Sequence, residues 1–205
     1  MRIYILRHED RTQDCSFFAP LTEKGLNNSV KLIEYLKKLN ITKIYCSPFI
    51  RTLQTIYPFV KEVNSTNSDF KINLEYGLSE IHNQDLIPPK AVGISLPEYL
   101  AKSFCCNLEY KSIIKPANEI NYPEKDKDVC LRVKRVLKKI IEEHSEINAN
   151  ILLVSHQSVC AHILKIVNRG STELDCKLEP TIITNYEKGK LSLVYENGWT
   201  YKSIN

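Results

Sequence analysis

A histidine that follows an arginine at the end of a short apolar run is the first group in this sequence that could do chemistry. Residues 3–6 read Ile-Tyr-Ile-Leu, a run that is too short for a helix and rich in β-forming residues, and Arg7 and His8 follow it directly. The run predicts a buried strand. His8 would then stand at the carboxyl end of that strand, where open α/β sheets bind their ligands.

Two further segments place similar groups after predicted strands. Residues 46–55 carry Arg51 at a strand-to-helix junction, and residues 153–156 read Leu-Val-Ser-His, which ends at His156. If the three strands are parallel neighbours, their carboxyl ends share one edge of the sheet and these side chains converge with Arg7 and His8. Two guanidinium groups and a second imidazole suit a dianionic phosphoryl group, because arginine offers a permanent charge and paired donors.

This arrangement predicts covalent phosphoryl transfer through His8. A neutral imidazole attacks phosphorus in line and gives a phosphohistidine that water later hydrolyses, with no need for a metal when arginines neutralise the phosphate. The leaving group needs a proton, and Glu80 follows the third predicted strand. Burial and a nearby phosphate dianion favour the protonated form of a carboxyl group, so we predict Glu80 as the proton donor. Asp10 is the alternative donor, although a solvated loop residue is the simpler interpretation.

Strand and helix patterns alternate along the chain. This alternation predicts an α/β fold with a mainly parallel sheet covered on both faces, and the alternating tail from 181 to 201 adds an antiparallel edge at the C-terminus. Hairpin turns are expected at 188–189 and 197–198, which read Lys-Gly and Asn-Gly. The predicted strands cover residues 3–6, 41–46, 70–74 and 150–154, and the predicted helices cover 22–39, 48–63, a long segment through 129–140, and 158–167.

Helical spacing also predicts which faces are buried. On the first helix, capped by Thr22, we expect one buried stripe of Leu26, Val30, Ile33 and Leu36, and on the long helix a stripe of Val129, Val133, Val136 and Ile140. The basic residues of that long helix are expected to form a solvated outer face: Arg132, Lys134, Arg135, Lys138 and Lys139.

Residues 81–125 show no sustained period and are rich in proline. Within a single domain spanning 1–205, this stretch is predicted to be an inserted cap or lid, with a short helix near 98–104. Its aromatic residues either stack on a substrate or pack within the lid: Tyr99, Phe104, Tyr110 and Tyr122.

Four motifs in register resemble those of the histidine phosphatase superfamily, in its phosphoglycerate mutase-like branch. Arg7-His8 with Arg11 is similar to the family's RHGxR, residues 21–25 to LTxxG, residues 47–55 to SPxxRxxQT, and residues 155–156 to SHG. The resemblance implies a three-layer α/β/α sandwich, no metal and no cofactor. It also implies a phosphorylated His8, a phosphate pocket completed by Arg7, Arg51 and His156, an extra substrate contact from Arg11, and Glu80 as the acid.

Two departures from the family pattern keep three functions open. Glu9 and Gln157 stand where the family has glycine after each histidine, and residues 81–85 do not resemble the corresponding stretch of the mutases. The favoured interpretation is a phosphomonoester hydrolase of the phosphatase type. The alternatives are a catalytically impaired phosphate-binding module and a phosphoglycerate mutase-type phosphotransferase.

Charge and composition limit the classes of molecule that this protein is expected to bind. A net charge of +4 over 205 residues is too weak to indicate nucleic acid, and no apolar run is long enough to span a membrane. Seven cysteines with no CxxC pair and no secretory pattern are typical of reduced thiols in a cytoplasmic protein without a metal site. The expected partner is a small phosphorylated substrate or a phosphoprotein. The sequence leaves the oligomeric state open, with a homodimer as one alternative.

Overall fold

The computed structural model describes residues 1–14, 16–66, 69–85, 87, 89, 93–144, 148–167, 183–187, 190–194 and 201–203, with backbone alone from 167 onward. One sheet runs through it in the order β3-β2-β4-β1-β5-β6-β7. Strands β3, β2, β4 and β1 pair in parallel, and β5, β6 and β7 continue antiparallel, which confirms the predicted C-terminal edge. The two predicted hairpin turns lie outside the described residues. The strands are β1 (Arg2–Arg7), β2 (Lys43–Cys46), β3 (Ile72–Leu74), β4 (Asn150–Ser155), β5 (Ile183–Glu187), β6 (Lys190–Val194) and β7 (Tyr201–Ser203).

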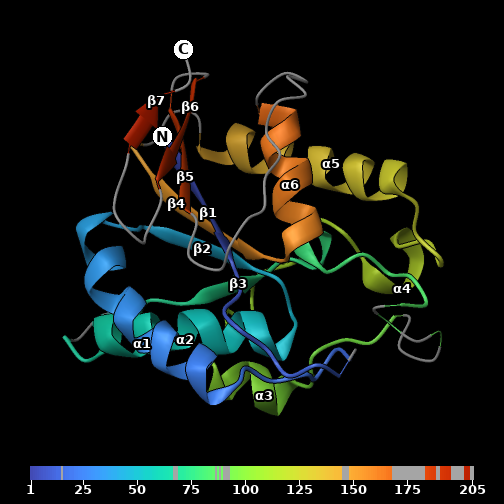
Figure 1. Ribbon diagram of the computed structural model, residues 1–205, viewed down its shortest axis with the longest axis horizontal. Helices are drawn as coiled ribbons and strands as arrows, with labels where there is room; N and C mark the ends of the chain where they lie inside the picture. The colour runs from blue at the N-terminus through green and yellow to red at the C-terminus, as the bar shows by residue number, and fades with distance from the viewer. Residues whose placement is uncertain are drawn as a thin grey trace.

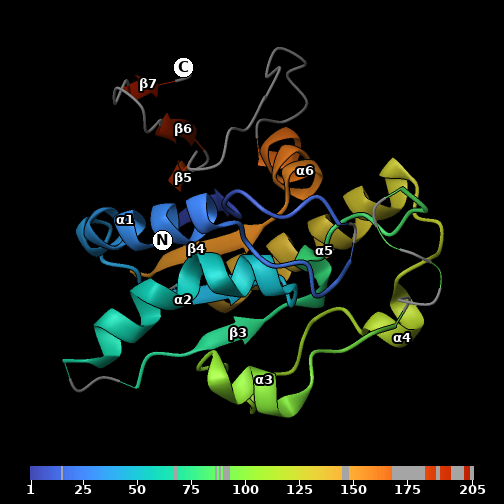
Figure 2. The same ribbon diagram turned by 60° about the horizontal axis from the view of Figure 1, so that its bottom comes forward.

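Helices cover both faces of the parallel strands, as the alternating pattern predicts. In β1 and β4, Tyr4 and Leu152 belong to the core under α1 (Glu23–Lys38) and α2 (Ile50–Asn64). Their neighbours Ile3 and Ile151 belong to the core under α5 (Asp126–His144) and α6 (Gln157–Val167). Successive residues of a strand point to opposite faces, so a strand buried on both sides is apolar throughout. Figure 1 shows α1 and α2 on one side of the sheet and α5 and α6 on the other, and Figure 2 shows the same layers from a second direction.

The buried face of α1 differs from the predicted stripe. Thr22 caps the helix as expected, accepting a hydrogen bond from the Gly25 amide at 3.1 Å. Leu26 and Val30, however, are 43% and 57% exposed. Leu36 is buried as predicted and Ile33 is half-buried, and the other buried residues of the helix are Gly25, Ser29, Leu32 and Tyr35. The reason is a close approach at the helix start, where a Cβ on Gly25 would lie 2.1 Å from the carbonyl oxygen of Asp10.

The long helix α5 confirms its apolar stripe and corrects the prediction for one basic residue. Val129, Val133, Val136 and Ile140 are all fully buried. Arg132 lies on that buried face and is only 5% exposed, so the solvated position predicted for it is wrong. It lies three positions after Val129, which places both on one side of the helix. The remaining basic residues of the cluster are exposed: Lys134, Arg135, Lys138 and Lys139.

The chain between β3 and α5 is mostly irregular, with a 3-10 turn η1 (Tyr76–Leu78) and two short helices, α3 (Glu98–Ser103) and α4 (Pro116–Glu119). The predicted helix near 98–104 is therefore present. Of the four aromatic residues predicted to stack or to pack, three are half-buried and contact the protein: Phe104 packs against the Tyr57 ring, Tyr110 donates a hydrogen bond to Glu75, and Tyr122 donates one to the Ile87 carbonyl. Tyr99 is 71% exposed. In the part of the chain that is described, no helix is both long and apolar enough to cross a bilayer.

Candidate active site

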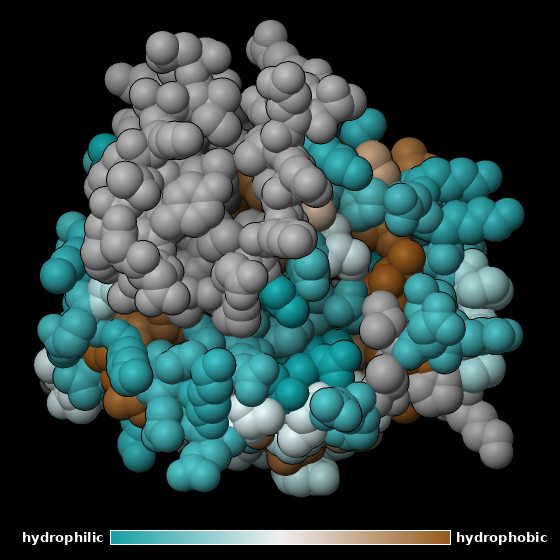
Figure 3. Space-filling view, viewed as in Figure 1, coloured by the Kyte–Doolittle hydropathy of each residue, from teal (hydrophilic) through white to brown (hydrophobic). Residues whose placement is uncertain are grey.

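The two histidines stand side by side because β1 and β4 are parallel neighbours. Arg7 pairs with Ser155 at the carboxyl ends of these strands, so His8 and His156 follow at the same level. Their ring centroids are 5.2 Å apart, with the rings edge to face. Seen from the same side as Figure 1, hydrophilic residues spread across the middle of the surface, where β1 and β4 end (Figure 3).

The hydrogen bond at His8 defines its tautomer. Nδ1 lies 2.7 Å from the carbonyl oxygen of Glu9, and a carbonyl oxygen can only accept, so Nδ1 carries the proton. Burial, and then the charges of Arg51, Arg7 and Arg11, lower the pKa of His8 to about 3, against the raising effect of that hydrogen bond. The imidazole is therefore neutral at physiological pH, with its lone pair on Nε2.

His156 is fully buried and also neutral. Its Nε2 shares a hydrogen bond with the Ser47 hydroxyl at 2.8 Å, and the ring of Phe49 packs edge-on at 4.8 Å. Burial is the main cause that lowers the pKa of His156 well below its ordinary value, and the charge of Arg51 adds to it. Ser47 is in place because β2 pairs with β4 on the other side from β1.

Arg51 comes from the first turn of α2 and is buried. One guanidinium nitrogen, Nη2, lies 3.9 Å from Oε2 of Glu80, and Nη1 donates to the Ser16 carbonyl at 3.0 Å. The guanidinium carbon stands 4.6 Å from the centre of the Phe49 ring, within range of a cation–π contact. These contacts fix a permanent positive charge beside the two imidazoles.

Glu80 completes the cluster from the segment after η1. Its Oε1 accepts hydrogen bonds from the Ser158 hydroxyl at 2.7 Å and from the Ile81 amide at 3.1 Å. Its Oε2 lies 3.5 Å from Nδ1 of His156 and faces Arg51. The carboxyl group is thus aimed at the edge where the strands carrying His8 and His156 end.

Glu75 and Gly77 set the path of the chain that leads to Glu80. The fully buried carboxylate of Glu75 accepts hydrogen bonds from the Gly77 amide at 2.8 Å and from the Ile113 amide at 2.8 Å, among others. A Cβ on Gly77 would lie 2.3 Å from a methyl group of Val136 on α5, so only glycine fits there without movement. The turn before Glu80 is therefore clamped between α5 and the segment around Ile113.

The two other predicted arginines take different positions. Arg7 is half-buried at the end of β1, next to His8. Arg11 uses Nη1 to donate to the carbonyls of Thr12 and Asp14, at 2.6 and 3.0 Å, so it is engaged by its own loop while its charge still reaches His8. The structure thus brings four of the predicted residues into one cluster: His8, Arg51, Glu80 and His156. Arg11 lies at the edge of this cluster.

Glu9 and Gln157 fit without the glycines that the family has there. Neither residue is among those with positive φ, which in the described chain are Asn40, Cys105 and Gly93. The Glu9 side chain is fully buried and its Oε2 accepts from Asn28 of α1 at 3.2 Å, while its amide donates to Thr55 at 3.0 Å. Gln157 is exposed at the start of α6. The carboxylate that Glu9 introduces in place of glycine is therefore directed toward α1.

Three of these residues have the geometry of a metal site, but their surroundings favour an anion. Ligand atoms of His8, Glu80 and His156 all lie within 4.8 Å of one another. The arginine charges that lower the pKa of both histidines also oppose the binding of a cation at the same point. The residues present therefore fit a phosphate better than a metal ion.

Sequence reasoning did not assign roles to Ser47, Phe49 and Ser158, which orient His156, Arg51 and Glu80. Ser47 and Phe49 lie within the segment that carries Arg51, and Ser158 lies two residues after His156. Ser47 is the first residue of the segment that resembles SPxxRxxQT, which could have marked it, and for Phe49 and Ser158 the only signal was their proximity to assigned residues.

Comparisons with known proteins agree with this geometry. A family model described as "Histidine phosphatase superfamily (branch 1)" matches residues 7–194. The chain belongs to this superfamily. No curated protein matches the sequence of this superfamily member significantly.

Solved structures resemble this superfamily member over nearly its whole length. Ecdysone phosphate phosphatase from Bombix mori, in complex with tungstate, superimposes with a TM-score of 0.64 at 16% identity, covering 99% of this chain and 92% of that one. A mycobacterial glucosyl-3-phosphoglycerate phosphatase with inorganic phosphate gives 0.61 at 15% identity, covering 100% and 95%. Phosphoglycerate mutase from Bacillus anthracis gives 0.62 at 20% identity, covering 100% and 92%. At these identities the likeness concerns the fold.

Proposed function

We propose that this protein is a metal-independent phosphomonoesterase that works through a phosphohistidine on His8. The observation that carries the proposal is the hydrogen bond from Nδ1 of His8 to the Glu9 carbonyl, which leaves the Nε2 lone pair for attack. Arg51, His156 and Glu80 surround that position with a fixed positive charge, a neutral imidazole and a carboxyl group. Membership of the superfamily and similarity to phosphatase structures support the same reaction class.

The first step transfers the phosphoryl group to the protein. Nε2 of His8 attacks phosphorus, the bond to the leaving oxygen breaks, and the carboxyl group of Glu80 gives that oxygen its proton. Arg7, Arg51 and His156 hold the equatorial oxygens, whose charge persists through a loose transition state. Arg11, at the edge, adds a positive charge for the incoming dianion.

The second step returns the protein to its starting state. Water attacks phosphorus, the Glu80 carboxylate takes a proton from that water, and the bond between phosphorus and Nε2 breaks to release inorganic phosphate. No metal or cofactor takes part, because the arginines supply the charge that a metal would otherwise provide. We propose a small phosphate monoester or a phosphoprotein as the substrate and hydrolysis as the main outcome.

The test is hydrolysis of p-nitrophenyl phosphate by the wild type and by His8→Ala, with EDTA present. We expect wild-type turnover, an acid-labile and base-stable phosphoenzyme after rapid quench, and loss of both in His8→Ala, with the circular dichroism spectrum unchanged. Turnover that survives in a folded His8→Ala protein contradicts the mechanism. A folded wild type that binds vanadate without forming a phosphoenzyme indicates a phosphate-binding module. Faster transfer to an added alcohol than to water indicates a phosphotransferase.

A further inference from the structure

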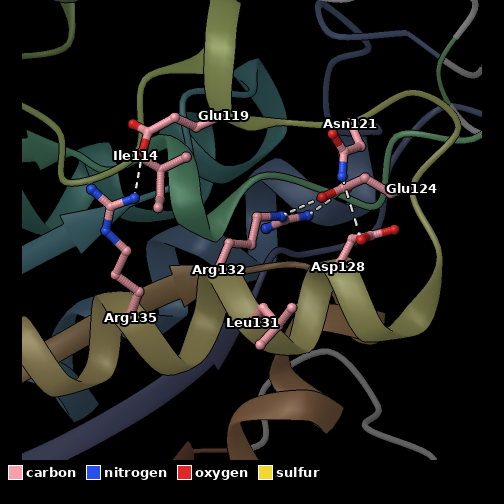
Figure 4. Close-up of a pocket in the computed structure, with 8 residues that line it drawn as sticks. All are labelled: Ile114, Glu119, Asn121, Glu124, Asp128, Leu131, Arg132 and Arg135. Carbon is pink, nitrogen blue, oxygen red and sulfur yellow. Dashed lines mark hydrogen bonds and ion pairs between the residues drawn. The ribbon is translucent and has the colours of Figure 1, made fainter.

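A buried ion pair stands behind the segment that carries Glu80. Arg132 of α5 donates from Nε to Oε1 of Glu124 at 2.7 Å and from Nη2 to Oε2 at 2.9 Å, a paired contact between two planar groups. Both side chains are almost fully buried. Arg132 extends from α5 to meet Glu124 (Figure 4), and both side chains line a pocket of about 250 Å³.

The same two side chains hold the backbone on both sides of Glu80. Arg132 donates from Nη1 to the Gly77 carbonyl at 2.7 Å and from Nη2 to the Glu80 carbonyl at 3.3 Å. Glu124 accepts the amide of His82 at 2.9 Å, and its own amide donates to the His82 carbonyl at 2.7 Å. Backbone groups of residues 77, 80 and 82 are therefore tied to one ion pair.

A buried ion pair contributes little net stability to a fold, because both charges must be removed from water. Removing two charges from water costs several kcal/mol, and apolar residues of similar size often stabilise as well or better. The planar guanidinium offers five donors in a rigid fork, so it can fix several acceptors in one geometry. Four of its hydrogen bonds are directed here, two to Glu124 and two to the backbone of the Glu80 segment.

We propose that Arg132 and Glu124 are positioning residues that set the place of the Glu80 carboxyl group relative to His8. The inference rests on the proposed role of Glu80 as proton donor. Glu80 reaches the site from an irregular segment, in contrast to His8 and His156, which strands position directly. The ion pair transfers the rigidity of α5 to that segment, which Glu75 clamps from the other end through Gly77.

The test compares two substrates that differ in one nitro group. Phenyl phosphate has the poorer leaving group and depends on a well-placed proton donor, whereas p-nitrophenyl phosphate depends on it much less. Arg132→Lys keeps the positive charge but loses the fork. We expect it to lower kcat/KM for phenyl phosphate about tenfold or more and to change the value for p-nitrophenyl phosphate much less.

Arg135 supplies the matched control. It lies one turn further along α5, is exposed, and pairs with Glu119 across the same pocket (Figure 4). Arg135→Lys is expected to leave kcat/KM unchanged for both substrates. An equal loss on both substrates in a folded Arg132→Lys protein overturns the proposal, because it indicates support of the phosphate site or of the fold.

The charge of Arg132 reaches His156, so an electrostatic role must be separated from a geometric one. If Arg132→Lys behaves as the wild type while Arg132→Met is impaired, charge is what matters and the positioning role is wrong. Where Arg132→Met fails to fold, Glu124→Gln takes its place. Glu124→Gln keeps the shape of the Glu124 side chain and leaves the charge of Arg132 in place, but it loses one hydrogen-bond acceptor. It should therefore show the same selective loss of kcat/KM for phenyl phosphate.

A double-mutant cycle distinguishes this inference from the proposed function. We expect Glu80→Gln alone to lower kcat/KM selectively for phenyl phosphate. Arg132→Lys should lower it little further in the Glu80→Gln background, because the group that it positions is gone. Losses that add in full contradict positioning and leave the role of Glu80 intact. If Glu80→Gln itself shows no selectivity between the substrates, Glu80 is not the donor, and both the assignment and the inference fail.

Discussion

The hydroxyl of Ser47 lies 2.8 Å from Nε2 of His156 and is the group that orients this buried imidazole. Ser47 follows β2 and His156 follows β4, so the contact exists only because these strands are neighbours in the sheet. A hydrogen bond at Nε2 fixes the ring plane, which in turn presents the opposite edge of the ring to Glu80.

Ser47→Ala should therefore reduce both stability and activity. An unsatisfied buried nitrogen costs about 1–3 kcal/mol in the free energy of unfolding, and a ring that is free to rotate is no longer oriented for the phosphate contact that we propose. Urea unfolding and kcat/KM for p-nitrophenyl phosphate measure the two effects. Ser103→Ala, which removes an exposed hydrogen bond to the Leu100 carbonyl, is the control and should change neither by much. Wild-type activity in Ser47→Ala would show that the orientation of His156 does not depend on this bond.

Glu80→Gln should slow substrates with poor leaving groups far more than those with good ones. The amide keeps the size of the side chain and can accept from Ser158, but it is too weak an acid to transfer a proton to the leaving group. General acid catalysis is worth about 10²–10⁴-fold, and we expect a loss in this range for phenyl phosphate. Steady-state kinetics across a series of aryl phosphates measures the dependence on the leaving group. A uniform effect across the series would remove Glu80 as the donor.

Glu9→Gly should leave catalysis close to that of the wild type. The Glu9 side chain is bonded to Asn28 on α1, and its backbone does not need the conformational freedom of glycine. Vanadate affinity and kcat/KM for p-nitrophenyl phosphate are the measurements. A large gain in activity would identify Glu9 as a defect of the site, and a large loss would show that the chain uses this carboxylate.

The low pKa of His8 should make stability fall in mild acid. Because the folded state lowers this pKa from 6.5 to about 3, the folded protein binds fewer protons than the unfolded chain between these values. The stability that this difference contributes is complete above pH 6.5 and is lost as the pH falls toward 3. Urea unfolding between about pH 7 and pH 5 should show a shallower decline for His8→Asn than for the wild type. Equal slopes would show that burial does not hold His8 neutral.

Several features of the fold and the site follow from the sequence alone. The apolar runs of β1 and β4 are buried on both faces, and such strands belong to parallel sheets. Parallel strands end at the same edge, so residues placed directly after them meet there. This is why His8, Arg51 and His156 could be predicted as one group. The antiparallel edge could be predicted for a separate reason, the alternating pattern of the tail.

Only the tertiary structure decided how individual side chains face one another. Helical periodicity gives the spacing of a buried stripe but not its rotation, and the close approach of Gly25 to Asp10 turned Leu26 and Val30 to solvent. Arg132 looked like one more charge on a basic helix, yet its partner Glu124 lies in a segment without any period to read. Contacts between residues far apart in sequence depend on how elements cross in space, and the periodicity of residue types along a chain does not reveal that crossing.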